Sequence, residues 1–177
     1  FFVLATQNPI ELEGTYPLPE AQLDRFLLNP VIDYLSVEDE IKMVGATTGE
    51  RKSEPEAIIS GEEVLKLQEI TRQIPASETV ISYAVALTSA SRPKSGDCDE
   101  WTKKRVRWGA GSRASQALIL ASKAKALLDG RPNASRDDVK SIAKSALRHR
   151  ILPSFFAESE GLDSDSIIDH LLETVPS

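Results

Sequence analysis

The sequence predicts a mainly α-helical protein in which the end of an α/β domain precedes an all-α domain. Two apolar runs, residues 1–6 and 26–35, have the length and the flanking breakers of buried strands. Residues 47–61 are rich in Gly, Ser, Glu and Pro and have no apolar periodicity. Beyond this stretch, apolar side chains recur at helical spacing. We therefore expect a strand-containing segment, then a linker, then a helical domain.

The amino-terminal segment places polar residues where a strand ends. Residues 1–6 lead into Gln7, Asn8 and Pro9. Ligands of open α/β sheets bind at the carboxyl ends of the strands, so Asn8 is a candidate functional residue, although Asn before Pro is also common turn chemistry. Residues 20–25 form a short helix in this interpretation. Ser36 is expected to cap the next helix, residues 37–46.

The helical domain is expected from the spacing of its apolar residues and from its helix caps. One helix, residues 112–128, ends near Gly130 and Pro132, as a helix stop should. Ser135 and Asp138 form an S-x-x-D cap before the next helix, whose apolar set runs through residues 139–147. A last helix is expected at residues 164–174.

Composition and charge exclude several classes of protein. The single Cys98 cannot form an internal disulfide or a thiolate metal site, so a reducing cytoplasm is the simplest location. No apolar run approaches the roughly 18 residues of a membrane span, and we expect no membrane insertion. His149 and His170 lack ligand-spaced partners, so no metal site is predicted.

The net charge of −6 is unevenly distributed. Residues 1–60 carry 11 acidic and 4 basic side chains, whereas residues 103–150 carry 3 acidic and 13 basic ones. Such a basic block indicates solvated helix faces or a surface for phosphate-bearing ligands, and we favour the first for most of its members. Trp101 and Trp108 flank four of these bases, and we expect them to fold under the helical domain rather than to stack on nucleic acid.

Three segments carry a resemblance to a known family. They are FFVLATQNP at residues 1–9, LPEAQLDRF at residues 18–26 and GAGSRA at residues 109–114. Together they resemble the MoxR branch of the AAA+ ATPases, from residue 1 to about residue 150. The resemblance implies the end of an α/β AAA+ core at residues 1–50, a linker at residues 51–62 and an all-α lid at residues 63–177.

The resemblance also implies roles for three residues. Asn8 corresponds to sensor 1, which holds the attacking water in line with the γ-phosphate. Arg25 corresponds to the arginine finger, which acts on the nucleotide of a neighbouring subunit, although an Arg beside Asp24 could be an ordinary surface ion pair. Arg113 corresponds to sensor 2 and would contact the γ-phosphate of its own subunit, with a solvated helix arginine as the alternative. Where the family typically reads GASPRA, this chain has Gly111 at the helix cap, a small departure.

The sequence contains no G-x-x-x-x-G-K-[ST] phosphate loop and no acidic strand end for magnesium. It therefore resembles the back half of an ATPase, whose ATP and Mg²⁺ would be held largely by residues outside it, and we predict that it is inactive alone. The family also implies a homo-oligomeric ring, often hexameric, chaperone-like remodelling or maturation of protein partners, and a von Willebrand factor A domain protein as a partner.

Two rival functions come from other classes. The basic block would suit a nucleic-acid motor of the related helicase branch, whose DNA affinity would depend steeply on salt. We consider nucleic acid the weaker interpretation. The second rival is a non-catalytic helical interaction module, which would describe this segment if it acted alone. A phosphate loop upstream of the segment would favour the ATPase.

Overall fold

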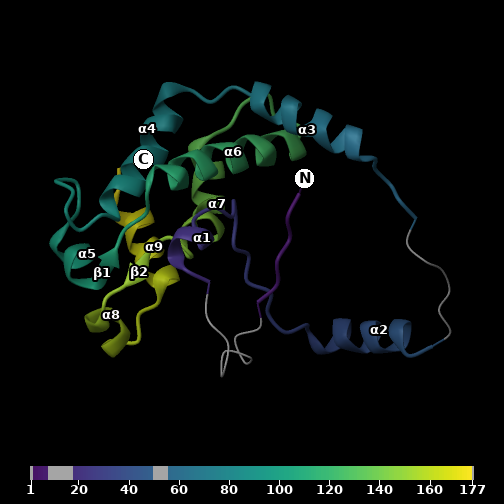
Figure 1. Ribbon diagram of the computed structural model, residues 1–177, viewed down its shortest axis with the longest axis horizontal. Coiled ribbons are helices and arrows are strands. Elements are labelled where there is room, and N and C mark those ends of the chain that lie inside the picture. The colour runs from purple at the N-terminus through teal and green to yellow at the C-terminus, as the bar shows by residue number, and fades with distance from the viewer. Residues whose placement is uncertain (1, 8–17, 50–55, 177) are drawn as a thin grey trace.

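The computed structural model describes residues 2–7, 18–49 and 56–176. Its centre is a helical body in which α6 lies between α3 and α4 on one side and α7 on the other, with α9 against α4 and α7 (Figure 1). The body consists of α3 (Gly61–Gln73), α4 (Glu78–Ala90), α6 (Ser112–Leu128), α7 (Arg136–Leu147) and α9 (Ser164–Thr174).

The core of this body is apolar and closely packed. Helix α6 contributes alanines to it, Ala114, Ala117, Ala121 and Ala126, whose small side chains let the neighbouring helices approach closely. Larger side chains from the other elements surround them and are fully buried: Leu87, Val139, Leu147, Ile151, Ile167, Ile168 and Leu171. Burying each such side chain contributes about 1.5–3 kcal/mol. The helical domain therefore has a continuous hydrophobic core of its own.

A small two-stranded antiparallel sheet lies at one side of the body. Strand β1 (Val106–Trp108) pairs antiparallel with β2 (Leu152–Pro153), with Val106 opposite Pro153 and Trp108 opposite Leu152. Each strand adjoins a short helix, α5 (Glu100–Arg105) and α8 (Phe155–Ser159). The Ser154 amide donates to the Arg105 carbonyl at 2.8 Å. This pairing fixes the chain that leads into α6 against the chain that leaves α7.

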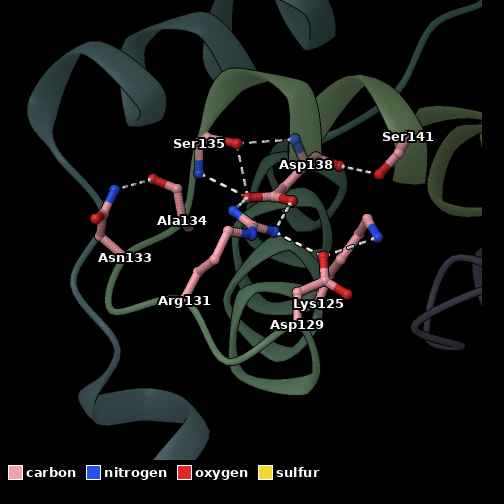
Figure 2. Close-up of polar contacts among 8 residues, drawn as sticks. All are labelled: Lys125, Asp129, Arg131, Asn133, Ala134, Ser135, Asp138 and Ser141. Carbon is pink, nitrogen blue, oxygen red and sulfur yellow. Dashed lines mark hydrogen bonds and ion pairs between the residues drawn. The ribbon is translucent and has the colours of Figure 1, made fainter.

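Helix α7 begins with the expected cap, and a buried ion pair reinforces it. The Ser135 hydroxyl accepts from the Asp138 amide, and the Asp138 carboxylate accepts from the Ser135 amide at 2.8 Å. Arg131 Nη1 donates to the same carboxylate at 2.8 Å (Figure 2). Asp138 is only 2% exposed, so this network ties the turn after α6 to the first turn of α7. The capping prediction is confirmed, and the contribution of Arg131 is added by the structure.

The described residues of the amino-terminal third form two helices. Helix α1 (Glu20–Leu23) lies against the helical body, whereas α2 (Val37–Thr47) lies apart from it and has no buried residue (Figure 1). The expected cap of α2 is present, because the Ser36 hydroxyl accepts from the Asp39 amide at 3.2 Å. The helix predictions for this segment are thus confirmed to within one or two residues.

The strand predictions for the same segment are wrong for the residues that the structure describes. Residues 2–7 and 26–35 form no strand, and large apolar side chains in them are exposed, including Leu4 at 85% and Ile32 at 90%. A strand is stable only when a neighbour accepts its amides and covers its apolar face. No such neighbour lies beside either run in the described residues, so the apolar pattern remains without a sheet.

The described residues contain neither a membrane-spanning helix nor a cluster of metal-ligating side chains. None of their helices combines the length and the apolar content that crossing a bilayer requires. Likewise, no group of three or more His, Cys, Asp or Glu side chains within ranges 2–7, 18–49 and 56–176 could hold a metal ion.

Candidate functional site

Arg113 lies in the first turn of α6, as expected. The helix begins at Ser112, and Gly111 is its N-cap with an extended backbone and no side-chain cap. The amino end of a helix carries free amides and a partial positive charge, which favour an anion. Arg113 adds a full positive charge at this end, and its side chain is 56% exposed. This helix end is therefore equipped to bind phosphate.

The turn before α6 is held rigidly against the end of α4. A Cβ at Gly109 would lie 2.3 Å from the Ser91 carbonyl oxygen, so only glycine fits. The neighbouring Ala110 amide donates to the Ser91 hydroxyl at 2.9 Å, and Arg92 Nε donates to the Ala110 carbonyl at 2.8 Å. These contacts set the direction in which α6 leaves the turn and hence where Arg113 points.

Arg25 follows the carboxyl end of α1 directly, and its side chain is exposed. Its amide donates to the Gln22 carbonyl at 3.1 Å, which continues the turn of the helix. Asp24, its neighbour, pairs with other arginines, so the simple Asp24–Arg25 ion pair considered above is not formed. Asn8, the third predicted residue, lies outside the described residues.

The Asp24 carboxylate joins two arginines of the helical body. Oδ1 accepts from Arg150 Nε at 2.9 Å, and Oδ2 accepts from Arg113 Nη1 at 3.1 Å. Burial raises the pKa of Asp24, but the hydrogen bonds from Arg113 and Arg150 outweigh it and hold the pKa below its usual value. Asp24 is therefore ionised at neutral pH and links the segment that carries Arg25 to the start of α6.

We call residues 24–29 the finger segment, and three consecutive basic residues at the end of α7 bind its backbone. Arg148 Nη1 donates to the Asn29 carbonyl at 3.0 Å, and the His149 ring Nε2 lies 3.2 Å from the Phe26 carbonyl. Arg150 donates to the carbonyls of Asp24, Phe26 and Leu27. We call Arg148, His149 and Arg150 the clamp.

The clamp residues differ in their electrostatic surroundings. The Arg150 side chain is only 3% exposed and is nearly saturated with acceptors. Arg148 also pairs with Asp165 at 2.7 Å. Burial, aided by the nearby charge of Arg150, lowers the pKa of His149 to about 4, so its imidazole is neutral at physiological pH. A neutral His149 fits this site, because the neighbouring Arg148 and Arg150 already bind the carboxylates of Asp165 and Asp24.

A cavity of about 610 Å³ opens where these elements meet. Its lining comes from α1, from the turn before α6, from the clamp and from the β1–β2 pair: Glu20, Ala21, Asp24, Arg107, Trp108, Gly109, Gly111, His149, Arg150 and Leu152. This volume suits a ligand of nucleotide size. Its lining combines two arginines and the helix-capping Gly111 with two carboxylates, those of Glu20 and Asp24.

Most arginines of the basic block are paired rather than free. Arg105 pairs with Glu160 at 2.7 Å, and it also lies over the Trp101 ring at 4.4 Å. The other Trp101 face stacks on His170, with the two ring centroids 4.0 Å apart. Trp101 thus packs into the helical body as expected, whereas Trp108 is 69% exposed, contrary to the prediction. Trp108 sits at the rim of the cavity instead.

Family models match both parts of the chain. The model described as "AAA lid domain" matches residues 98–171, which include α6, α7 and most of α9. The model described as "ATPase family associated with various cellular activities (AAA)" matches residues 1–28, which include Arg25.

The chain is also similar to proteins over nearly its whole length. It is 36% identical to Chaperone MoxR1 of Mycobacterium tuberculosis over 99% of the chain and 46% of that protein. This chain belongs to the MoxR-type AAA+ family. It is 35% identical to protein YeaC of Bacillus subtilis over 99% of the chain and 52% of that protein. The chain thus spans about half the length of these relatives.

A solved structure confirms the fold. A Cytophaga hutchinsonii protein assigned as an ATPase superposes with a TM-score of 0.91 at 34% identity, over 99% of this chain and 54% of that one. The MoxR-type chain is therefore mainly α-helical, with the end of an AAA+ core followed by a helical lid, as the sequence predicted. The part of the helical body that matches the lid model includes α6, α7 and most of α9.

The clamp is the part of the site that sequence reasoning missed. Arg148 and Arg150 belong to the basic block, for most of whose members the sequence favours solvated helix faces, and His149 has no ligand-spaced partner that would indicate a metal site. The structure places all three against the finger segment, more than 110 residues earlier in the chain. The available signal was the Arg-His-Arg run just after the apolar positions of α7 end, where helical periodicity no longer explains the residues.

Proposed function

We propose that this chain is the sensor and lid part of an ATP-hydrolysing MoxR-type subunit. In this proposal residues 1–50 end the AAA+ core, residues 51–62 connect, and residues 63–177 form the lid. Arg113 binds the γ-phosphate in its own subunit. Arg25 completes the site of the neighbouring subunit, and Asn8 orients the attacking water.

One observation carries the proposal: Arg113 in the first turn of α6 contacts Asp24 of the finger segment, and Asp24 and Gly111 line the same cavity of about 610 Å³. The amino end of α6, Arg107 and Arg150 line this cavity together with the carboxylates of Glu20 and Asp24, so a phosphate group would compete with these carboxylates for the cationic groups. The described residues offer no cluster of metal ligands, so the Mg²⁺ that accompanies ATP would be held by the phosphate-binding half. When bound, Mg²⁺ would neutralise charge on the β- and γ-phosphates.

The exposed placement of Arg25 supports its assignment to the neighbouring subunit. Its side chain is exposed, whereas Asp24 beside it turns toward the lid of its own chain. An exposed guanidinium can reach a second subunit. Its rigid, positively charged set of N–H donors can stabilise the negative charge that develops on the transferred phosphoryl group. The proposal therefore requires a ring of subunits, with one finger for each nucleotide.

We further propose that ATP turnover in this ring drives remodelling or maturation of protein partners, including a von Willebrand factor A domain protein, in the cytoplasm. The name of the Mycobacterium tuberculosis relative, Chaperone MoxR1, supports the chaperone part. The helicase alternative receives less support, because Arg105, Arg131, Arg148 and Arg150 of the basic block are paired with carboxylates. Partner capture that depends on ATP, with no salt-dependent DNA binding, is the expected outcome.

The test uses the full-length subunit, which carries the phosphate-binding half. Arg25→Ala should lower the hydrolysis rate by about 10³-fold or more while ATP still binds, because the finger acts on the transition state of a neighbour. Arg113→Ala should instead weaken ATP binding and turnover in the mutated subunit. Arg72→Ala, an exposed arginine of α3, is the matched control and should hydrolyse ATP normally.

Mixing the two variants separates the roles. Arg25→Ala subunits keep an intact site, and Arg113→Ala subunits keep an intact finger. Mixed rings should therefore regain part of the activity that each variant lacks alone. Absence of any regain, or a wild-type protein that does not hydrolyse ATP, would contradict the proposed function.

A further inference from the structure

Asp24 is shared by two arginines that differ in how firmly they are held. Arg150 binds one carboxylate oxygen and Arg113 binds the other. The Arg150 side chain is 3% exposed, and that of Arg113 is 56% exposed. The same carboxylate therefore makes one buried contact and one contact that solvent and ligands can reach.

The contact with Arg150 is permanent. Its guanidinium also donates to backbone carbonyls of the finger segment and to the Ala146 carbonyl of α7. Breaking this pair would leave a charge buried without its partner, which is strongly unfavourable. Asp24 therefore stays attached to the lid through Arg150 whatever the state of the cavity.

The contact with Arg113 is exchangeable. An exposed ion pair of this kind changes the equilibrium constant between the paired and the separated side chains by about fivefold at most. A γ-phosphate at the amino end of α6 carries more charge than one carboxylate and would meet the free amides of the helix as well as Arg113. Such a phosphate would displace Asp24 from Arg113.

The displacement would reach Arg25 through one peptide bond. Asp24 is the C-cap of α1, and its amide donates to the Glu20 carbonyl at 2.9 Å. Arg25 continues that turn. Release of Arg113 leaves the Asp24 carboxylate bound to Arg150 alone, so the residue that precedes Arg25 loses one of its two attachments to the lid.

We propose that Asp24 is a positioning residue that couples γ-phosphate recognition by Arg113 in one subunit to the placement of the Arg25 finger in the next subunit's site. This inference rests on the proposed function. Without a γ-phosphate, Asp24 holds Arg113 and the finger segment in the arrangement described here. With a γ-phosphate, Arg113 turns to the nucleotide, and Asp24 remains on Arg150 alone.

The test compares Asp24→Asn with Asp169→Asn in the full-length subunit. Asp169 also pairs with a lid cation, Lys144, at 2.8 Å, but it lies away from the cavity and should behave as wild type. Asp24→Asn frees Arg113, so the ratio of ATP to ADP affinity should rise by about twofold to fivefold. Because the finger is mispositioned, the hydrolysis rate should fall by about 10- to 100-fold.

Two further measurements separate positioning from mere stability. In an Arg113→Gln background, Asp24→Asn should no longer change the ratio of ATP to ADP affinity, because the coupling partner is gone. In mixed rings, Asp24→Asn should be rescued by Arg113→Ala subunits, which lend an intact finger, and not by Arg25→Ala subunits, which lend none. If Asp24→Asn does not fold, Asp24→Glu, which keeps the charge and moves the carboxylate, should show the same rescue pattern.

The other outcomes overturn the inference. An unchanged hydrolysis rate, rescue by Arg25→Ala alone, or rescue by neither partner would mean that Asp24 acts in its own site or only in folding. If those results appear while the Arg25→Ala and Arg113→Ala mixture is active, the proposed function stands and the coupling fails. A wild-type ring without ATP hydrolysis would overturn both.

Discussion

Replacing Asp138 with Asn should destabilise the lid in a way that depends on pH. The Asp138 carboxylate is almost fully buried and accepts from Arg131 and from the Ser135 amide and hydroxyl (Figure 2). The hydrogen bond from Arg131 is the main cause that lowers the pKa of Asp138 to about 2, against an ordinary value of 3.8. At about 1.4 kcal/mol per pKa unit, this shift corresponds to roughly 2 kcal/mol of folding free energy.

The sign follows from which state holds the proton. Because the pKa of Asp138 is lower in the folded protein, its contribution is present above about pH 4 and is lost as the pH falls toward 2. Asp138→Asn should therefore cost about 2 kcal/mol at pH 7 and about half of that difference at pH 3. For a domain of this size, the loss at neutral pH lowers the melting temperature by about 5–10 °C.

Urea unfolding followed by far-ultraviolet circular dichroism, at pH 7 and pH 3, measures both values. Asp137→Asn is the matched control, since Asp137 lies in the same first turn of α7 but is exposed. It removes the same charge from the helix amino end without touching the Arg131 network. If the two variants lose equal stability at pH 7, or if the Asp138→Asn loss is the same at both pH values, the reasoning fails.

Three other predictions concern the site. Gly109→Ala should destabilise the chain by about 2 kcal/mol or more in urea unfolding, because the new Cβ would meet the Ser91 carbonyl. Gly111→Ala is the control, since its Cβ would enter open space, and its stability should stay within about 0.5 kcal/mol of wild type. Equal effects of the two changes would refute the close packing at Gly109. Acidification from pH 7 to pH 5 should cost about 2 kcal/mol through His149, whose pKa is lowered to about 4 on folding, and His149→Gln should lose this sensitivity. The 177-residue chain alone should show no magnesium-dependent ATP hydrolysis above background, because it lacks a phosphate loop.

Local signals in the sequence predicted much of the helical architecture. Ser36 and Ser135 were expected to cap helices, and both do so, because a cap depends only on a hydroxyl and an amide three residues apart. The start of α6 after Gly111, and with it the place of Arg113, followed from the same kind of local pattern. Such features involve few residues and are nearly independent of the rest of the chain.

The strand predictions failed because a strand is not a local structure. Residues 26–35 have an apolar pattern suited to a sheet, but sheet hydrogen bonds need a partner, and the described residues provide none. What the same residues do instead depends on the lid: the Asn29 amide donates to the Ser145 carbonyl of α7 at 2.7 Å. The apolar pattern left the partner of these residues undetermined.

The sequence by itself determined the family resemblance, the approximate bounds of α1, α2, α6, α7 and α9, and three candidate residues, because motifs and caps depend on neighbouring positions. Only the tertiary structure decided that Asp24 bridges Arg113 and Arg150, and that Arg150 is buried rather than solvated. These partners are 89 and 126 residues from Asp24. A charged side chain carries no local mark of which distant carboxylate it will meet, since packing of the whole lid brings the two together.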